Sequence, residues 1–341
     1  MAPMRRPSAA GSATTQSRGR REVAPVVQAQ SIGRRFGPLW ALRDVTFALE
    51  EGETIAVLGE PGSGKTTLLR LICALDRPTV GSVELFGRRA RPNLGSIRAS
   101  IAAAFGTSGL DPLLTVAENI SLRILLSGVP AHHRTGVMVE RLRAFGLYDA
   151  KDVPCRLISP GMRRRLALAC SLVATPRLLV LDGLVDAVDA SDKATLEEAV
   201  RGMVSSSRTT AVVSVSDPAD AEWCSRVAVL SHGRLLVLDT PEGLKRMVGP
   251  DTLLIRPIDD RLAAARLADR LGIRVEREAD GLLKVEVEHG PDALADVLQG
   301  FAAHLSAVHI RRPTLADAYQ RLVSGGEGVA IAAGDEAKQS S

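Results

Sequence analysis

Gly59-Glu60-Pro61-Gly62-Ser63-Gly64-Lys65-Thr66 fits the P-loop pattern, in which a glycine and four further residues precede Gly-Lys-Thr. The apolar run 54–58 before it predicts a short buried strand, and the pattern over about 65–76 after it predicts a helix. Backbone N–H groups of such a loop surround a phosphate, together with the positive end of the helix. The lysine reaches the β- and γ-phosphates, and the threonine hydroxyl holds Mg²⁺. The sequence therefore predicts a triphosphate site formed by Gly59, Glu60, Pro61, Gly62, Ser63, Gly64, Lys65, Thr66 and Thr67.

Strand-like apolar runs alternate with helical patterns through the first two thirds of the chain. Further buried strands are predicted at 178–181 and 211–213, and helices at about 115–127, 161–174, 191–205 and 218–224. Such alternation is typical of an α/β fold, in which helices cover both faces of a parallel sheet. Asp182 directly follows the strand 178–181, so we expect its carboxylate beside the P-loop, where it holds the Mg²⁺ together with Thr66.

A second unit begins near residue 250, with strands and helices in the order βαββαβ. Its first helix is expected at 259–271, and the order predicts a small ferredoxin-like α+β domain, followed by a last helix at about 314–323. We therefore divide the chain into an α/β nucleotide-binding domain, 25–249, and an accessory domain, 250–324. A basic leader, 1–24, and a tail, 325–341, are rich in small and polar residues and are expected to be disordered.

Charge and composition exclude several classes of protein. The chain has 341 residues and a net charge of +4, but residues 1–25 hold five arginines and one acid, so the remainder is balanced. With that balance, 3% aromatic residues and no basic recognition helix, we expect no nucleic-acid partner. No uncharged apolar run approaches ~18 residues, so the sequence predicts no membrane span. The four cysteines stand far apart, which favours buried thiols in a reducing compartment.

Five further segments carry a family resemblance. They are 34–37 (Arg-Arg-Phe-Gly) with 41–45 (Ala-Leu-Arg-Asp-Val), 114–119 (Leu-Thr-Val-Ala-Glu-Asn), 159–166 (Ser-Pro-Gly-Met-Arg-Arg-Arg-Leu), 187–189 (Ala-Val-Asp) and 312–318 (Arg-Pro-Thr-Leu-Ala-Asp-Ala). Together with the P-loop, they resemble the ATP-binding subunit of an ABC transporter, in particular the drug-resistance (ABC-2) exporter type that pairs with a separate permease. The resemblance extends over about residues 26–324. It implies an ABC-type nucleotide-binding domain with ATP and Mg²⁺ as ligands, and Phe36 as the aromatic residue that stacks on adenine.

The resemblance also implies partners. Subunits of this kind form a head-to-tail dimer, in which each ATP lies between one P-loop and the other subunit's signature segment. Here Ser159 and Gly161 would contact the nucleotide of the second ATP-binding subunit. The resemblance further implies a separate membrane-spanning permease and a place in the cytoplasm, at the inner face of the cell membrane.

Three positions depart from the family pattern. Gly183 stands where the family has the glutamate that polarises the attacking water, and Gly106 stands at the position of a glutamine that contacts Mg²⁺ and the water. Ser216, or Val215 if the turn is one residue shorter, replaces the switch histidine, and His232 is expected in a surface turn. The sequence therefore predicts a subunit that binds ATP but hydrolyses it poorly, paired with a complete ATP-binding subunit in a heterodimer rather than a homodimer.

Two alternatives remain open at this point. The chain could be the working ATPase of a homodimeric exporter, with Asp186 as a non-standard base. It could also be an ATP-sensing regulator outside transport, whose βαββαβ domain binds a further ligand. Substitution of Asp186 by asparagine separates the first alternative from a poorly hydrolysing subunit, because only the first expects a large loss of rate.

Overall fold

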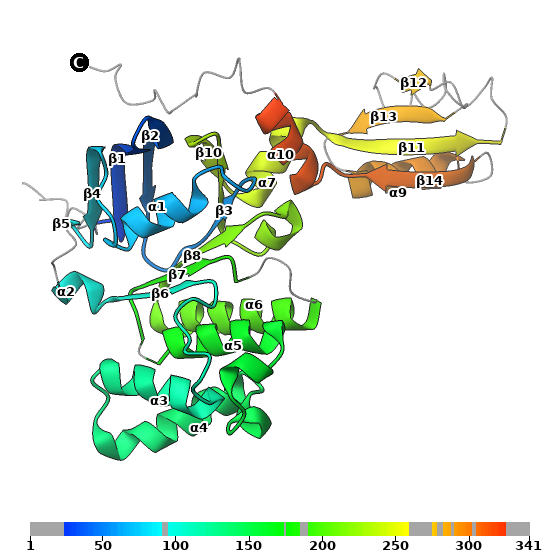
Figure 1. Ribbon diagram of the computed structural model, residues 1–341. Coiled ribbons are helices and arrows are strands. Elements are labelled where there is room, and N and C mark those ends of the chain that lie inside the picture. Colours follow the sequence, from blue (N-terminus) through cyan, green and yellow to red (C-terminus); the bar gives the residue numbers. More distant parts are fainter. Residues whose placement is uncertain are drawn as a thin grey trace, which may run out of the picture.

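The computed structural model of the chain describes residues 24–90, 95–173, 175–184, 190–258, 275–277, 282–287, 290–301 and 305–324. Except for Ala24, the leader and the tail that the sequence predicts to be disordered lie outside these ranges. The predicted α/β fold is confirmed, with a six-stranded sheet at its centre (Figure 1). Five neighbouring strands are parallel, and one edge strand is antiparallel. The spatial order is β10 (Arg234–Asp239), β9 (Arg226–Ser231), β3 (Thr54–Leu58), β8 (Thr210–Val215), β7 (Leu178–Asp182) and β6 (Ile101–Phe105).

The side chains of the central strands alternate between two apolar layers. In β3, Ile55 and Val57 enter one layer, whereas Ala56 and Leu58 enter the other. The first layer is shared with α1 (Lys65–Ile72), and the second with α5 (Pro160–Ser171) and α6 (Ala190–Ser207). Because both faces are covered, every residue of β3 and β8 is buried, which explains the continuous apolar runs in the sequence.

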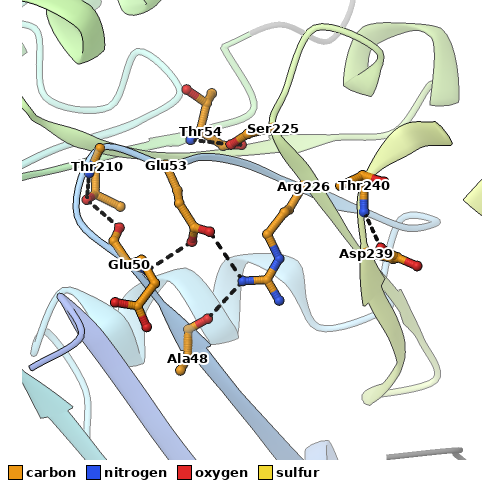
Figure 2. Close-up of polar contacts among 10 residues, drawn as sticks. Ala48, Glu50, Glu53, Thr54, Thr210, Ser225, Arg226, Asp239 and Thr240 are labelled. Atoms are coloured by element: carbon orange, nitrogen blue, oxygen red, sulfur yellow. Dashed lines mark hydrogen bonds and ion pairs between the residues drawn. The ribbon is translucent and has the colours of Figure 1, made fainter. Parts of the chain in front are cut away.

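An antiparallel sheet covers the α1 side of this core, in the order β2 (Leu39–Leu49), β1 (Val27–Phe36), β4 (Val80–Leu85) and β5 (Arg88–Arg89). Figure 2 shows the polar network that joins it to the parallel sheet. Arg226 on β9 donates to the Ala48 carbonyl at 3.3 Å and pairs with Glu53 at 3.5 Å. The Thr54 N–H donates to Ser225 Oγ at 2.8 Å. This network fixes the amino end of β3, so the strand is held firmly before the P-loop leaves its carboxyl end.

A helical layer extends below the parallel sheet, where α3 (Val116–Leu126) and α4 (Arg134–Ala144) pack on each other next to α5 (Figure 1). Asn119 on α3 is buried, and its side-chain amide donates to the carbonyl oxygens of Asp111, Leu114 and Thr115. One side chain thus fixes the loop that leads into the helix. The shorter helical elements are α2 (Gly95–Arg98), η1 (Ala131–His133), η2 (Tyr148–Ala150) and η3 (Cys155–Leu157).

Two predicted helices are shorter than expected. The helix predicted at 65–76 ends at Ile72, because Ala74 adopts a left-handed backbone with φ of 51°. The segment 218–224 contains only one 3₁₀ turn, η4 (Pro218–Ala221), which the Asp217 side chain caps by accepting from the Ala219 N–H. The chain must turn there to enter β9, so no room remains for a full helix.

The described part of the C-terminal unit forms its own antiparallel sheet, in the order β12 (Val275–Arg277), β13 (Leu283–Val287), β11 (Asp251–Pro257) and β14 (Leu305–Arg311). With α9 (Gly290–Phe301), this is the strand order of the predicted ferredoxin-like unit. The helix predicted at 259–271 lies outside the described residues. A separate apolar cluster that includes Leu253, Val285 and Val297 fills the space between α9 and the sheet.

Two helices connect this C-terminal sheet to the rest of the molecule. The first, α7 (Pro241–Val248), precedes it, and the second, α10 (Leu315–Ser324), follows it. They lie against each other, and Arg321 on α10 donates to the carbonyl oxygen of Val248. Leu315 and Ala318 are buried in the main apolar layer next to the parallel sheet. The chain therefore returns to the α/β core after it has built the C-terminal sheet.

The cysteines are buried and free, as the sequence predicts. Burial raises the pKa of the Cys73 and Cys170 thiols to about 12, so neither is a thiolate at neutral pH. Among the described helices, none combines the length and the apolar character that crossing a membrane requires.

Candidate nucleotide-binding site

A cavity of about 880 Å³ opens where the carboxyl ends of the parallel strands meet. Its wall contains six of the nine predicted P-loop residues: Pro61, Gly62, Gly64, Lys65, Thr66 and Thr67. Arg43, Lys65 and Arg234 bring positive charge to the wall, and among the described wall residues Asp182 carries the one carboxylate. The excess of positive charge favours a highly anionic ligand.

The P-loop adopts a cradle that requires glycine. Gly64 has φ of 104°, and a Cβ atom there would lie 2.5 Å from the Ala41 carbonyl oxygen. Lys65 begins α1, and its Nζ donates to the carbonyl oxygens of Gly59 and, at 3.1 Å, Glu60. These contacts hold the ammonium group at the loop, where a phosphate would bind.

The buried hydroxyl of Ser63 bears on whether the P-loop fits a phosphate group. Ser63 is 5% exposed, and its Oγ is buried with no hydrogen-bond partner among the described residues. A buried hydroxyl without a partner is costly unless a ligand or water completes its bonding. The helix that begins at Lys65 adds an N-terminal positive end beside it. The P-loop therefore fits a triphosphate.

The two residues that the sequence predicts as Mg²⁺ ligands, Thr66 and Asp182, lie in the same wall. Asp182 ends β7, and Thr66 stands in the first turn of α1. The hydroxyl of Ser214 donates to Asp182 Oδ1 at 2.6 Å and accepts the Gly183 N–H at 2.9 Å. Mg²⁺ is commonly held by one or two protein oxygens together with substrate phosphates and water. Thr66 and Asp182 suit that role.

The three positions that depart from the family pattern come together at this wall. Gly106, Gly183 and Ser216 all line the cavity, although they follow three different strands. The φ values of Gly106 and Gly183 are 55° and 65°, so both loops use a backbone conformation that favours glycine. A Cβ atom built at either position has nothing within 4 Å. The cavity is therefore open where the family places two of its catalytic side chains. Asp186, the candidate base, lies outside the described residues.

Several wall residues were not predicted from the sequence. Leu39, Trp40 and Arg43 come from β2, His232 comes from the turn between β9 and β10, and Arg234 begins β10. The two segments meet through backbone contacts, as when the Arg43 N–H donates to the Gly233 carbonyl at 2.8 Å. His232 is exposed as expected, yet it also contributes to the wall.

Phe36, which the resemblance assigns to adenine, stands at the end of β1 and is 48% exposed. It does not belong to the cavity wall, whereas Trp40 on the facing strand does. No single motif in the sequence marks Trp40.

The signature segment lies apart from this cavity. Ser159 is exposed and caps α5, because its Oγ accepts the Met162 N–H at 3.1 Å. Pro160 occupies the first helical position, where no N–H is needed, and Gly161 follows it. Neither Ser159 nor Gly161 lines the cavity.

A P-loop after a central strand, with a carboxylate at the end of a nearby parallel strand, defines a P-loop nucleotide-binding protein. The family model described as ABC transporter matches residues 42–185. A relative of nearly equal extent is the daunorubicin resistance ATP-binding protein DrrA2 of Streptomyces coeruleorubidus. It is 30% identical over 305 residues, which cover 87% of this chain and 94% of that protein. The chain belongs to the family of ABC transporter ATP-binding proteins.

Two further comparisons agree with this assignment. The daunorubicin/doxorubicin resistance ATP-binding protein DrrA of Streptomyces peucetius is 32% identical over 233 residues, with 67% of this chain and 70% of that protein covered. A dimeric ATP-binding cassette, solved in a post-hydrolysis state with ADP and Pi, superposes with a TM-score of 0.59 at 25% identity. That match covers 63% of this chain and 98% of the cassette. The resemblance to the drug-resistance type is confirmed by these relatives.

Proposed function

We propose that this chain is the ATP-binding subunit of an ABC exporter, that it binds Mg-ATP at the P-loop, and that its own hydrolysis is impaired. It works with a separate membrane permease and with a second, catalytically complete ATP-binding subunit, in a heterodimer. One observation carries the proposal: Lys65, Thr66 and Asp182 share a cavity in which Gly106 and Gly183 replace catalytic side chains of the family. The export direction rests on relatives named for resistance to daunorubicin and doxorubicin.

Binding of ATP follows from the donors in the wall. The P-loop N–H groups and Lys65 receive the phosphates, and Thr66 and Asp182 hold the cation. Mg²⁺, when bound, supplies positive charge that neutralises the phosphate oxygens.

Impaired hydrolysis follows from three described wall positions, Gly106, Gly183 and Ser216. A positioned general base typically contributes ~10²–10⁴ in rate. Gly106 and Gly183 have no side chain that could orient or polarise a water molecule, and the Ser216 hydroxyl is a far weaker base than an imidazole. Groups that position and polarise one water act as a unit, so the loss of one already removes most of their effect.

The need for a second ATP-binding subunit follows from the signature segment. Ser159 and Gly161 lie outside the chain's own nucleotide cavity, and the exposed helix end that they form can accept a phosphate of another subunit. The similar cassette that was solved with ADP and Pi is dimeric. We propose that this chain contributes its signature segment to the site of a partner that retains the catalytic residues.

An exposed apolar patch supports a membrane partner. Leu113 is 75% exposed at the entry to α3, and Leu157 is 65% exposed on the neighbouring segment, whose Cys155 N–H donates to the Leu114 carbonyl. Further exposed leucines are on α3 itself: Leu122, Leu125 and Leu126. Gathered apolar side chains at a surface mark an interaction site. We propose that this patch contacts the permease, which places the subunit in the cytoplasm at the inner face of the membrane.

We also propose the division into a nucleotide-binding domain, 25–249, and an accessory domain, 250–324. The separate apolar cluster of the C-terminal sheet supports an accessory unit, whereas Leu315 and Ala318 at the end of the chain belong to the apolar layer of the nucleotide-binding domain. The accessory domain would affect the dimer or the choice of partner subunit.

The test is to measure ATP binding and phosphate release on one preparation. Isothermal titration with Mg-ATP should give saturable binding by the wild-type protein, and the Lys65→Ala variant should lose most of it. Phosphate release should stay far below ~1 per second, the low end of ordinary enzyme turnover. Turnover at that rate or above would contradict impaired hydrolysis, and absence of binding would contradict the ATP-binding function.

A second experiment addresses the partners. The full-length protein is purified with a tag from its native cell, and co-purifying proteins are identified by mass spectrometry. We expect a permease with several membrane spans and a second ATP-binding protein that has glutamate after the strand aspartate. Recovery of this chain as a homodimer with a permease and no second ATP-binding protein would contradict the heterodimer.

A further inference from the structure

A short segment behind the nucleotide cavity is held by three helices. It runs from Ser216, which lines the cavity, through η4 to Glu222. Its start is joined to the P-loop, because the Gly59 N–H donates to the carbonyl of Val215, the last residue of β8, at 3.4 Å. Asp217 fixes the turn by capping η4. A displacement of η4 would therefore reach the cavity wall at Ser216.

The first of these helices is α6. Lys193, in the first turn of α6, donates to both carboxylate oxygens of Asp220 on η4, at 2.7 and 2.8 Å. The Asp220 side chain is only 11% exposed, so the pair is partly shielded from solvent. Removal of one partner from such a pair leaves a desolvated charge without its counter-ion, which makes the pair sensitive to substitution. Lys193 therefore fixes η4 against α6.

The other two helices, α7 and α10, flank the C-terminal sheet. Lys245 on α7 forms an ion pair with Glu222, one residue after η4. Ala221 is fully buried, in the same apolar layer as Leu244 of α7 and Leu315 of α10. α10 also contacts η4 directly. The C-terminal sheet begins shortly after α7 and ends shortly before α10, so both of its supporting helices rest on η4 and Glu222.

Ser216 stands at the end of the cavity where the cation would bind. It follows β8 two residues after Ser214, whose hydroxyl donates to Asp182 Oδ1 at 2.6 Å. Asp182 is the carboxylate that we propose as a Mg²⁺ ligand, and the β- and γ-phosphates of a bound triphosphate share that cation. A diphosphate has no γ-phosphate to place there. The segment that begins at Ser216 is therefore suited to distinguish ATP from ADP.

We propose that Asp220 and Glu222 are positioning residues that couple the nucleotide site to the C-terminal sheet. The inference rests on the proposed ATP-binding function and adds a regulatory connection to that same site. Lys193 and Lys245 hold Ser216 in its place in the wall, and a bound triphosphate in turn stabilises the packing of α7 and α10 on η4. Coupling between two sites is reciprocal. A partner subunit bound to the C-terminal sheet would therefore change the affinity for ATP by the same factor by which ATP changes the affinity for that subunit.

Amide hydrogen exchange of the full-length protein tests this coupling. Saturating Mg-ATP should slow exchange in α7 and α10 of the wild-type protein, and saturating Mg-ADP should slow it less. In Glu222→Gln, the effect of Mg-ATP on both helices should be lost, while the P-loop is still protected. The charge-swapped variant, Glu222→Lys with Lys245→Glu, should restore the effect, because it rebuilds the ion pair. Exchange in α7 and α10 that does not respond to Mg-ATP in the wild-type protein would overturn the proposal.

Calorimetric affinities of matched variants complete the test. Asp220→Asn should weaken Mg-ATP binding about fivefold or more, the low end of typical coupling factors, and should affect Mg-ADP binding less. Glu286→Gln is the control, because Glu286 pairs with Lys284 within the C-terminal sheet; this exposed pair should contribute little, so affinity should stay within about twofold of wild type. Thermal unfolding shows whether each variant is folded.

The two proposals fail in different ways. Equal affinities of Asp220→Asn and the wild-type protein for both nucleotides would overturn the coupling. If the wild-type protein itself fails to bind Mg-ATP, the proposed function fails together with this inference. If it binds Mg-ATP and exchange in α7 and α10 does not change, only this inference fails.

Discussion

Among the described residues, Ser214 joins the Asp182 carboxylate, which we propose as a Mg²⁺ ligand, to Gly183. It is 1% exposed, and its hydroxyl contacts both Asp182 Oδ1 and the Gly183 N–H. The Gly106 N–H donates to the Asp182 carbonyl at 2.6 Å, so the three strand ends are fixed to one another. Groups that orient a metal ligand commonly matter nearly as much as the ligand itself.

We expect Ser214→Ala to weaken Mg-dependent ATP binding about tenfold or more, because the Asp182 carboxylate loses its orienting donor. The Gly183 N–H loses its acceptor as well, which costs about 1–3 kcal/mol of unfolding free energy. Titration with and without Mg²⁺, and denaturant unfolding, measure the two effects. Ser231→Ala is the matched control, since Ser231 is buried on β9 and makes no described contact with Asp182. Equal effects of the two substitutions would contradict this role of Ser214.

The catalytic positions give a gain-of-function test. Gly183→Glu alone should raise phosphate release by less than tenfold, because Gly106 and Ser216 still cannot orient the water. The triple variant with Gly106→Gln and Ser216→His should raise it by about 100-fold or more. Each non-glycine residue at φ near 60° costs about 1–2 kcal/mol, so all these variants should also be less stable.

The control for this test is the triple alanine variant at the same positions, which carries the same backbone strain without the functional groups. It should lose similar stability and gain no activity. If the variant with glutamate, glutamine and histidine stays as slow as the alanine variant, these three positions are not the cause of slow hydrolysis.

At the residue scale, the sequence predicted what is local and missed what depends on distant contacts. Lys65 and Asp182 could be predicted, because a loop pattern or a strand end marks each of them. Trp40 and Arg234 could not, since their place in the wall depends on how β2 meets the β9–β10 turn. The resemblance assigns Phe36 to the base, but Phe36 does not belong to the described cavity wall, whereas Trp40 does.

Two reciprocal hydrogen bonds fix the start of α3. The Glu118 N–H donates to Thr115 Oγ1 at 3.2 Å, and the Thr115 N–H donates to Glu118 Oε2 at 2.7 Å. The two bonds form a capping box, which satisfies N–H groups that a helix start leaves free. The exposed leucines of α3 that we assign to the permease therefore stand on a helix whose beginning is fixed.

This capping box should make stability depend on pH. The backbone N–H and then the hydroxyl of Thr115 lower the pKa of Glu118 below its ordinary value of 4.5. A depressed pKa in the folded state stabilises the fold above the unfolded-state pKa, and this contribution is lost as pH falls through the folded-state value. The stability difference between wild type and Glu118→Gln should therefore shrink from pH 6 to pH 3 in denaturant titrations. Glu140→Gln, on the exposed surface of α4, should show a constant difference; the same trend in both variants would contradict the assignment.

At the element scale, the sequence predicted the buried strands well. β3, β7 and β8 are covered on both faces, so their apolar runs are nearly continuous. Helix ends were less predictable, because backbone geometry outside the apolar pattern decides them. Ala74 ends α1 early, and Pro218 begins a single 3₁₀ turn where a helix was predicted.

On the scale of the whole molecule, α10 is sequentially C-terminal but structurally part of the α/β core. Its Leu315 is 1% exposed within the main apolar layer. Burial, and then the charge of Glu60 on the P-loop, raise the pKa of Tyr319, which shows that the helix passes close to the nucleotide cradle. The last helix thus stabilises the domain that binds the nucleotide.

Leu315→Ala should therefore destabilise the α/β core, by about 2–5 kcal/mol as for other buried leucines. Amide hydrogen exchange should become faster in β8 and α7, and should change less in β11 and β13. Leu298→Ala on α9 is the control: Leu298 is 45% exposed, and its truncation should change stability by no more than about 0.5 kcal/mol. Faster exchange confined to the C-terminal sheet would contradict this assignment of α10.

The contact between α7 and α10 has a consequence for how this architecture can be altered. The chain leaves the α/β core after Val248 and returns to it at α10, where Arg321 donates a hydrogen bond to the Val248 carbonyl oxygen. The segment between these two points therefore begins and ends at neighbouring places, which is the geometry of one domain inserted into another. Such an inserted domain only needs two ends that lie a short distance apart. A different small domain, or a short linker, could replace this segment while α10 stays packed on the α/β core.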